Sequence, residues 1–235
     1  MKINNKLFIM VALLAMGSVA QAAKTITSSA IKLVPDGKTV NTAAIQRAID
    51  DLSRRGGGTL IIQPGQYVTG TIEMKSNTEL HLEQGATLLG SLNPLDYIDV
   101  TQQGADRSNP AKFNYLSLAL IEAYQATNIK LTGQGTIDAR GCEVSLAIDS
   151  LHKAGVRKDP NYFDRLNRPR EAMRPNLFTI NGCDGIEVSG LRLRNAACWG
   201  LVFFRCKNLK IEQVDVHNRA YWNNDGIDIV DCHHV

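Results

Sequence analysis

A short β-type pattern that recurs along the chain constrains the fold more than any other feature. In each of five segments, an aliphatic residue stands three positions after the first residue, and in the four longer ones another follows at five. This alternation is typical of a strand with one buried and one exposed face. The segments are NTELHL (77–82), ATNIKL (126–131), CDGIEV (183–188), CKNLKI (206–211) and CHHV (232–235).

The spacing of these segments favours a solenoid of strands. The last three begin 23 and 26 residues apart, whereas the earlier gaps are 49 and 57 residues. Helical repeats need longer units with a 3.6-residue period, and propeller blades need about forty residues each. We therefore predict an all-β fold, a right-handed parallel β-helix. We interpret each of the two long gaps as two coils, the second of which carries an insertion.

Three of the five cysteines recur at the same place in successive segments. Cys183, Cys206 and Cys232 begin their segments, while Cys142 and Cys198 lie elsewhere, and no CxxC pair is present. Stacked coils would place the three in a ladder. Buried thiols that pack as small apolar groups are one interpretation, and a disulfide between neighbouring coils is the other.

One amphipathic helix is predicted before the coils, within NTAAIQRAIDDLSRRGGG (41–58). Its apolar residues at helical spacing are Ile45, Ile49 and Leu52. Asn41 or Thr42 can cap its start, and Gly56 to Gly58 end it. Because a solenoid has an apolar end that must be covered, we expect this helix to cap the first coil. The next strands are predicted to break at Pro64-Gly65.

The first 22 residues have the features of a secretory signal peptide. Lys2 and Lys6 precede an apolar run over residues 7–16, and Ala20-Gln21-Ala22 forms a small-x-small cleavage site. An uncleaved membrane anchor is the alternative. We expect a secreted or periplasmic protein whose mature chain begins near Ala23 and forms one domain over residues 23–235.

Charge and histidine placement argue against several kinds of partner. Removal of Lys2 and Lys6 leaves 24 Lys and Arg against 23 Asp and Glu, so the mature chain lacks the basic surface of a nucleic-acid-binding protein. No later stretch is apolar enough to span a membrane. His233 and His234 would point to opposite faces of a strand. We therefore predict no metal, no cofactor, no nucleic acid and no membrane partner, and we expect a monomer.

Residues 143–175 break the repeat. They are polar and hold seven Lys and Arg between Lys153 and Arg174, against three acids. We interpret them as a long loop inserted into one coil. The loop is either a solvated surface insertion or an arm over a groove that attracts an anionic ligand.

Five segments taken in order resemble glycoside hydrolase family 28, the polygalacturonase and rhamnogalacturonase family. The resemblance covers nearly all of residues 30–235 and implies a pectin-lyase-like right-handed β-helix. It also implies an inverting hydrolase of pectic polysaccharide, with acidic plant cell-wall galacturonan or rhamnogalacturonan as its partner. The segments are DGKTVNTAAIQRAIDDLSRRGGGTLIIQPGQYVTGTI (36–72), GATLLGS (85–91), GQGTIDARG (133–141), RPNLFTINGCDGIEVSGLRLRNAACWGL (174–201) and NNDGIDI (223–229).

The last segment matches the family's Asn-Thr-Asp-Gly-x-Asp motif. The resemblance implies that Asp225 is catalytic and helps to activate the attacking water. Asn223 matches the motif's asparagine, whereas Asn224 replaces its threonine. We take Asn223 and Asp228 as candidate substrate-binding residues. Asn223 could instead serve a turn, and Asp228, three residues from Asp225, is expected to brace the bend through hydrogen bonds to backbone groups.

Other features of the family are missing from this sequence. The resemblance leads us to expect an Asp-Asp pair about one coil after Asp225, and none follows before Val235. We therefore expect that the sequence is a fragment with little or no hydrolase activity. A pectate-lyase-like enzyme and a carbohydrate-binding β-helix without activity are the alternatives. Trp199 and Trp222 could stack on a sugar, although aromatic packing is the expected role.

Overall fold

The computed structural model describes residues 24–98, 118–159 and 162–235. The predicted signal peptide lies outside these residues.

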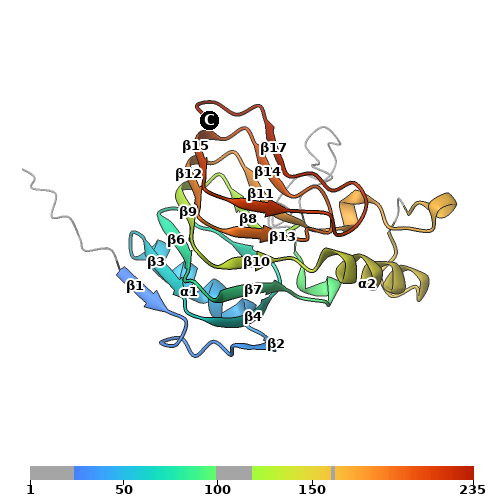
Figure 1. Ribbon diagram of the computed structural model, residues 1–235, viewed down its shortest axis with the longest axis horizontal. Helices are drawn as coiled ribbons and strands as arrows, with labels where there is room; N and C mark the ends of the chain where they lie inside the picture. Colours follow the sequence, from blue (N-terminus) through green and yellow to red (C-terminus); the bar gives the residue numbers. More distant parts are fainter. Residues whose placement is uncertain (1–23, 99–117, 160–161) are drawn as a thin grey trace, which may run out of the picture.

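The described strands form three sheets, A, B and C, in which all neighbouring strands pair in parallel (Figure 1). Sheet A consists of β1 (Lys24–Thr27), β3 (Gly58–Ile62), β6 (Thr78–Leu82), β9 (Thr127–Gly133), β12 (Asp184–Ser189) and β15 (Lys207–Glu212). Sheet B consists of β2 (Asp36–Val40), β4 (Gly65–Thr69), β7 (Ala86–Gly90), β10 (Thr136–Asp138), β13 (Arg192–Arg194) and β16 (Asp215–His217). Sheet C consists of β5 (Ile72–Glu73), β8 (Ala119–Tyr124), β11 (Asn176–Asn181), β14 (Leu201–Phe204) and β17 (Ile227–Val230).

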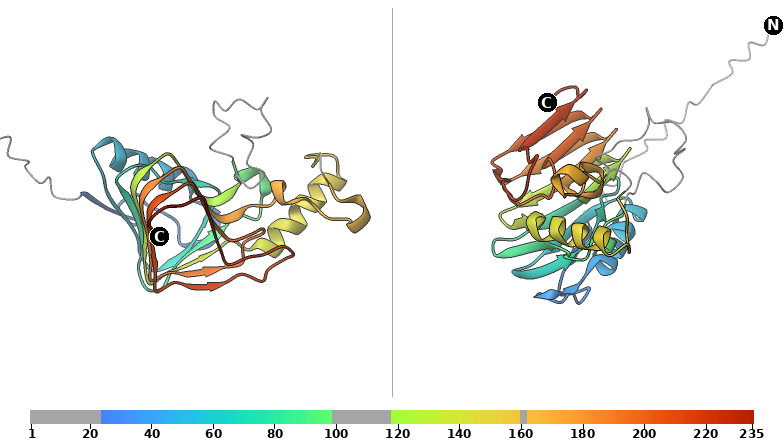
Figure 2. Two further views of the ribbon diagram at one scale, coloured as in Figure 1. Left: turned by 90° about the horizontal axis from the view of Figure 1, so that it is seen from above. Right: turned by 90° about the vertical axis from the view of Figure 1, so that its right-hand side faces the viewer.

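The chain visits the sheets in the order A, B, C and then returns to A one coil higher. Seen from above, the coils lie on one another (Figure 2). The aliphatic positions of the second, third and fourth segments stack in the predicted register, because Leu131 pairs with Val188 and Val188 pairs with Ile211. The first segment is displaced by two residues, since Leu80 pairs with Leu131 rather than with Ile129. These side chains are buried or packed against the core. The prediction of a right-handed parallel β-helix is confirmed.

The interpretation of the two long gaps as pairs of coils is wrong. β6 pairs directly with β9, and β9 pairs directly with β12, so each gap is a single coil. In the sequence, the extra residues come after β7 and after β10, between a strand of sheet B and the next strand of sheet C. Insertions at a corner lengthen a coil without disturbing the strand register, and the repeat pattern alone does not reveal them.

The insertion after β10 is not wholly a loop. Helix α2 (Gly141–Lys153) occupies its first part, and the 3-10 turns η4 (Asp164–Leu166) and η5 (Glu171–Met173) follow. The helix lies beside the coils rather than in the stack (Figures 1 and 2). It begins against the next coil, because a Cβ on Gly141 would come within 2.3 Å of the Ala196 main chain. The arginine-rich residues of the insertion follow the helix, and α2 itself buries only a short apolar face that includes Val144 and Ile148.

Helix α1 (Thr42–Arg54) confirms the predicted capping helix. It takes the place in the first coil that a sheet C strand has in later coils, and it packs against β3, β5 and β6. The expected apolar residues Ile45, Ile49 and Leu52 are buried. The Asn41 side chain does not cap the helix but bonds to the main chain of Val34 and Thr39. A further 3-10 turn, η1 (Pro94–Asp96), follows β7.

The helices of the described residues are each too short or too polar to cross a lipid bilayer.

The three ladder cysteines stack as predicted, and all are free thiols. The Cys206 N–H donates to the Cys232 sulfur at 3.3 Å, and the Ala126 N–H donates to the Cys183 sulfur at 3.3 Å. Burial raises the pKa of Cys183 to about 11 and that of Cys206 to about 12. Since thiols in this state are poor nucleophiles, the ladder packs as part of the core.

Candidate functional site

The segment with the family motif lies at the corner between β16 and β17. This corner, from sheet B to sheet C, is the same one at which the α2 insertion leaves the coil. Topology therefore brings residues 168–174 beside Trp222 and Asn223, although about 50 positions separate the contacting residues in sequence. The corner of the coil below is formed by residues 195–200.

The main chain of Asp225 is bound at both of its polar groups, by the coil below at its N–H and by Asn218 of its own corner at its carbonyl. Its N–H donates to the Trp199 carbonyl at 2.6 Å, and its carbonyl accepts from Nδ2 of Asn218 at 2.6 Å. Asn218 also donates to the Trp199 carbonyl at 2.8 Å and accepts from the Ala196 N–H at 2.7 Å. The Asp225 side chain is exposed. A fixed backbone with an exposed carboxylate is what a reacting carboxylate requires.

Asn224, which replaces the motif's threonine, has a structural role. Its Nδ2 donates to the carbonyls of Ala196 and Cys198 at 3.0 and 2.6 Å, and its Oδ1 accepts from the Tyr221 N–H at 2.7 Å. The side chain thus holds the turn to the coil below. Its amide is committed to these bonds, so it is not placed to contact substrate.

Asn223 serves a turn in the structure. It is exposed, with a left-handed φ of 56° that asparagine tolerates better than most residues. Its Nδ2 lies 3.4 Å from Oε1 of Glu171 in η5. The contact is on the surface, so the side chain stays near Asp225 and open to a ligand.

Asp228 lies in β17, in register with the buried Val202 of β14. It faces away from its neighbours Ile227 and Ile229, which continue the inward columns of sheet C. The expectation that it braces the bend is wrong, because its Oδ2 is buried and has no hydrogen-bond partner among the described residues. Burial, and after it the charge of Asp225, raises the pKa of this carboxyl above its ordinary value.

Two arginines from the insertion lie against Trp222, next to the motif. The Arg168 guanidinium lies 3.3 Å from the centre of the indole ring, and that of Arg174 lies 4.1 Å from it. Trp222 is half-buried. These contacts agree with the expected packing role of Trp222. A sugar could stack on this ring only by displacing an arginine.

The positive charge of the insertion is mostly engaged within the protein. Lys153 pairs with Asp149 at 2.7 Å, and Arg157 donates to the Pro94 carbonyl at 2.8 Å. Arg170 stacks on Phe163 at 3.8 Å. The insertion is thus an arm fastened over the B–C corner by its own cations, and the count of basic residues in the sequence overstates the charge available to an anionic ligand.

Buried polar atoms that find no hydrogen-bond partner within residues 24–98, 118–159 and 162–235 gather at this corner. They include Nε of Arg168, Nε and Nη2 of Arg174, and Nε1 of both Trp199 and Trp222, besides Oδ2 of Asp228. Most buried polar groups in proteins are bonded, so a group of exceptions at one place indicates a functional site or bound water. The sequence reasoning counted Arg168 and Arg174 among the charges of the arm but missed that both pack against Trp222.

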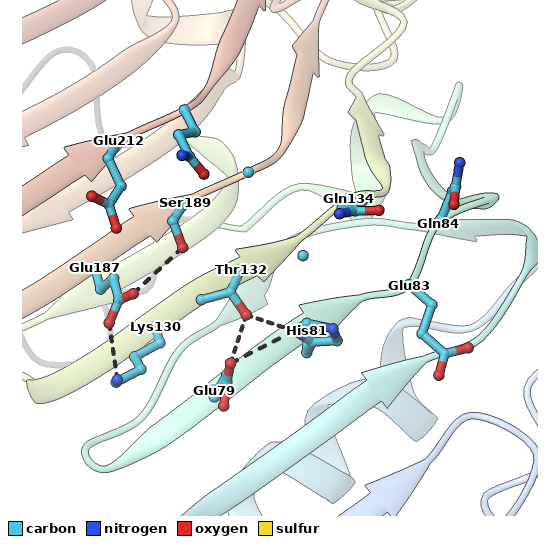
Figure 3. A pocket seen from close by; sticks show the side chains of 13 residues that line it. Glu79, His81, Glu83, Gln84, Lys130, Thr132, Gln134, Glu187, Ser189 and Glu212 are labelled. Carbon is cyan, nitrogen blue, oxygen red and sulfur yellow. Dashed lines mark hydrogen bonds and ion pairs between the residues drawn. The ribbon is translucent and has the colours of Figure 1, made fainter.

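A polar hollow on the outer face of sheet A is the other conspicuous surface feature. It measures about 540 Å³ and is lined by residues of β6, β9, β12 and β15. Figure 3 shows Thr132 donating to Oε1 of Glu79 at 2.6 Å and meeting His81 at 2.7 Å. Lys130 pairs with Glu187 at 2.9 Å. These groups bind one another across neighbouring strands, and no group of three potential metal-ligating side chains gathers anywhere in the described residues.

Comparison with known proteins gives consistent matches. An exo-poly-alpha-D-galacturonosidase from Dickeya chrysanthemi is 29% identical over 221 residues, which cover 82% of this chain and 36% of that protein. The chain therefore spans about a third of that relative's length. A protein from Parabacteroides merdae ATCC 43184, assigned as a glycosyl hydrolase, superposes with a TM-score of 0.69 at 27% identity, over 89% of this chain and 84% of that one.

A Yersinia enterocolitica family 28 exopolygalacturonase superposes with a TM-score of 0.62 at 25% identity, over 82% of this chain and 38% of that one. The model of the family described as glycosyl hydrolases family 28 matches residues 75–235. This match covers well over half of the chain and includes the corner segment that holds Asp225. The protein therefore belongs to glycosyl hydrolases family 28.

Proposed function

We propose that this chain forms part of a hydrolase site for pectic, galacturonate-rich polysaccharide, with Asp225 as the carboxylate that activates water. One observation carries the proposal: Asp225 stands at the family motif as an exposed carboxylate whose main chain is fixed at both polar groups. The galacturonosidase and exopolygalacturonase relatives support the substrate class.

Inverting hydrolysis needs two carboxyl groups, a base that activates water and an acid that protonates the leaving oxygen. Asp225 suits the first role, because it is exposed and its position is held by the coil below. We assign Asn223 and Asp228 to substrate contact. Asn223 lies at the surface two residues before Asp225, and the carboxyl of Asp228 has an oxygen without a hydrogen-bond partner among the described residues.

The substrate we propose lies outside the cytoplasm, in keeping with the predicted signal peptide at residues 1–22 and with a monomer that acts on a polymer. Galacturonan is soluble enough to reach an exposed site, and no cofactor enters the proposed reaction.

The test compares residues 23–235 with two variants, Asp225→Asn and Asp231→Asn. Asp231 is a matched control, because it is an exposed aspartate directly after β17 and pairs loosely with Arg205 at 3.7 Å. Binding of oligogalacturonate is measured by calorimetry, and released reducing ends are counted after incubation with polygalacturonate.

We expect all three proteins to bind oligogalacturonate more tightly than a neutral oligosaccharide of equal length. Any release of reducing ends should fall by at least ~100-fold in Asp225→Asn and stay unchanged in Asp231→Asn, since general base catalysis contributes on this scale. Products that absorb in the ultraviolet would show elimination instead of hydrolysis. Binding without Asp225-dependent cleavage would leave only a carbohydrate-binding role.

A further inference from the structure

Arg174 is a buried charge placed beside the motif. The residue is 1% exposed, and its guanidinium has Glu171 as its nearest carboxylate, with Nη2 3.6 Å from Oε1. Burial lowers the pKa of this guanidinium. Its Nε and Nη2 have no hydrogen-bond partner among the described residues. A buried charge with two unbonded nitrogens is costly to keep, so this guanidinium points to a role beyond packing.

One nitrogen of Arg174 connects two successive coils. Its Nη1 donates to the Ala197 carbonyl at 2.6 Å and to the Trp222 carbonyl at 2.8 Å. Ala197 belongs to the corner below, and Trp222 belongs to the corner that leads into the motif. The same guanidinium lies 4.1 Å from the Trp222 ring. Arg174 therefore fixes both the main chain and the side chain of the residue three positions before Asp225.

The other end of this corner is fixed by Asn218, which bonds the carbonyls of Trp199 and Asp225. Asn224 ties the middle of the corner to Ala196 and Cys198. Three polar side chains thus bind main-chain groups of the two corners along their whole length. Of the three, only Arg174 comes from outside these corners, at the end of the arm.

We propose that Arg174 is a positioning residue that sets the path of the main chain from Trp222 to Asp225 and so aims the Asp225 carboxylate. The role rests on the proposed function, in which Asp225 is the reacting group. Arg174 itself does not touch the substrate, since its side chain is covered. Through the hydrogen bonds of Arg174 to the Ala197 and Trp222 carbonyls, the arm formed by the insertion is linked to the site by buried contacts rather than by surface charge.

The experiment uses Arg174→Gln, Arg174→Lys and the control Arg157→Gln in residues 23–235. Arg157 is a second arginine of the arm that donates to a main-chain carbonyl, that of Pro94, away from Trp222. The first readout is the pair of backbone amide resonances of Asp225 and Gly226 in 1H–15N spectra. The second is release of reducing ends from polygalacturonate, together with binding of oligogalacturonate.

In Arg174→Gln we expect displaced Asp225 and Gly226 resonances and a rate lowered by ~10- to 100-fold, since small misplacements of a reacting group cost this much. Oligogalacturonate affinity should change by less than about three-fold, because substrate contacts persist. Arg174→Lys, which keeps the charge and one donor, should lie between Arg174→Gln and the wild type. Arg157→Gln should leave the resonances and the rate unchanged.

A folded Arg174→Gln protein with unmoved Asp225 resonances overturns the inference, even if its melting temperature falls. Should Arg174→Gln fail to fold, Arg174→Lys carries the same test, and unmoved resonances there count equally against it. If the wild-type protein neither binds oligogalacturonate nor cleaves polygalacturonate, the proposed function is wrong, but the inference about Arg174 is not affected. The resonances still decide whether Arg174 sets the geometry of Asp225.

Discussion

The outer face of sheet A and the corner that leads into sheet C differ in how their polar groups are hydrogen-bonded. On sheet A, Lys130 bonds Glu187, and Glu79 accepts from the hydroxyls of Thr59 and Thr132 at 2.8 and 2.6 Å. At the corner, buried atoms of Arg168, Arg174, Trp199, Trp222 and Asp228 lack hydrogen-bond partners among the described residues.

Hydrogen bonding distinguishes the candidate functional surface from the structural one better than surface shape does. The hollow on sheet A has a volume of about 540 Å³, yet its polar groups bond one another as ordinary cross-strand pairs. The corner leaves polar groups unsatisfied and aims an exposed carboxylate outward. Violations of ordinary bonding rules are expected where a protein binds or reacts. We therefore expect substitutions on the two surfaces to differ in kind.

The largest expected difference is in catalysis. Asp225→Asn should lower any hydrolysis of polygalacturonate by at least ~100-fold, because the amide cannot accept a proton from water. Glu187→Gln on sheet A should leave the rate unchanged, since that carboxylate is committed to Lys130. Initial rates of reducing-end release at saturating substrate measure both. Equal losses in the two variants would remove the functional distinction between the surfaces.

The next difference is in stability. Arg174→Met should lower the free energy of unfolding by about 2 kcal/mol, because it leaves the Ala197 and Trp222 carbonyls without their shared donor. Lys130→Met, which removes a half-exposed cation from sheet A, should cost less than about 1 kcal/mol. Urea unfolding at neutral pH, followed by circular dichroism, measures both.

Similar costs for Arg174→Met and Lys130→Met would mean that burial does not distinguish the two charges. A stabilised Arg174→Met protein would be the sharper result. It would show that the buried guanidinium of Arg174 lowers the stability of the folded protein, which is expected of a group that serves function rather than folding.

The fold was predictable from the sequence because the same strand pattern recurs in successive coils. Leu131, Val188 and Ile211 stand at the same position of the pattern and pair in register in sheet A. Leu80 pairs with Leu131, two positions away from the alignment expected from the sequence. The number of coils was not predictable, because insertions at the B–C corner stretch a coil to 49 or 57 residues. Helix α2 was hidden for a related reason, since it lies outside the stack and its buried face is short.

The site was only partly predictable. The motif located Asp225, whose exposure agrees with a surface role, but motif spacing cannot say which groups support it. The contacts of Arg174 with Ala197 and Trp222, and of Asn218 with Ala196, link residues 22 to 48 positions apart, and they exist only once the coils are stacked. For Asp228, alternation gave the direction of the side chain, whereas the lack of a bonding partner needed the structure.

A smaller difference concerns the two half-buried acids of these surfaces. Burial and the charge of Asp225 raise the folded-state pKa of Asp228, so ionisation at neutral pH opposes folding. Asp228→Asn should therefore stabilise the protein at neutral pH, by about 0.5 kcal/mol. The gain should vanish below the ordinary aspartate pKa of 3.8. Thermal melts across this pH range test it, and destabilisation at neutral pH would reveal an unrecognised bond to Asp228.

Glu187 should show the opposite pH dependence and the smallest effect. Its hydrogen bond with Lys130 lowers its pKa from the ordinary 4.5, so its ionised form is favoured in the folded state. The resulting stability is present above the ordinary pKa and is lost as the pH falls through the lowered one. Glu187→Gln should therefore cost about 0.5 kcal/mol at neutral pH, the scale of a partly exposed ion pair. The cost should disappear in acid, and Lys130→Gln in the same background should add almost nothing, since the pair is already broken. A cost that persists in acid would show that Glu187 stabilises sheet A by packing rather than by charge.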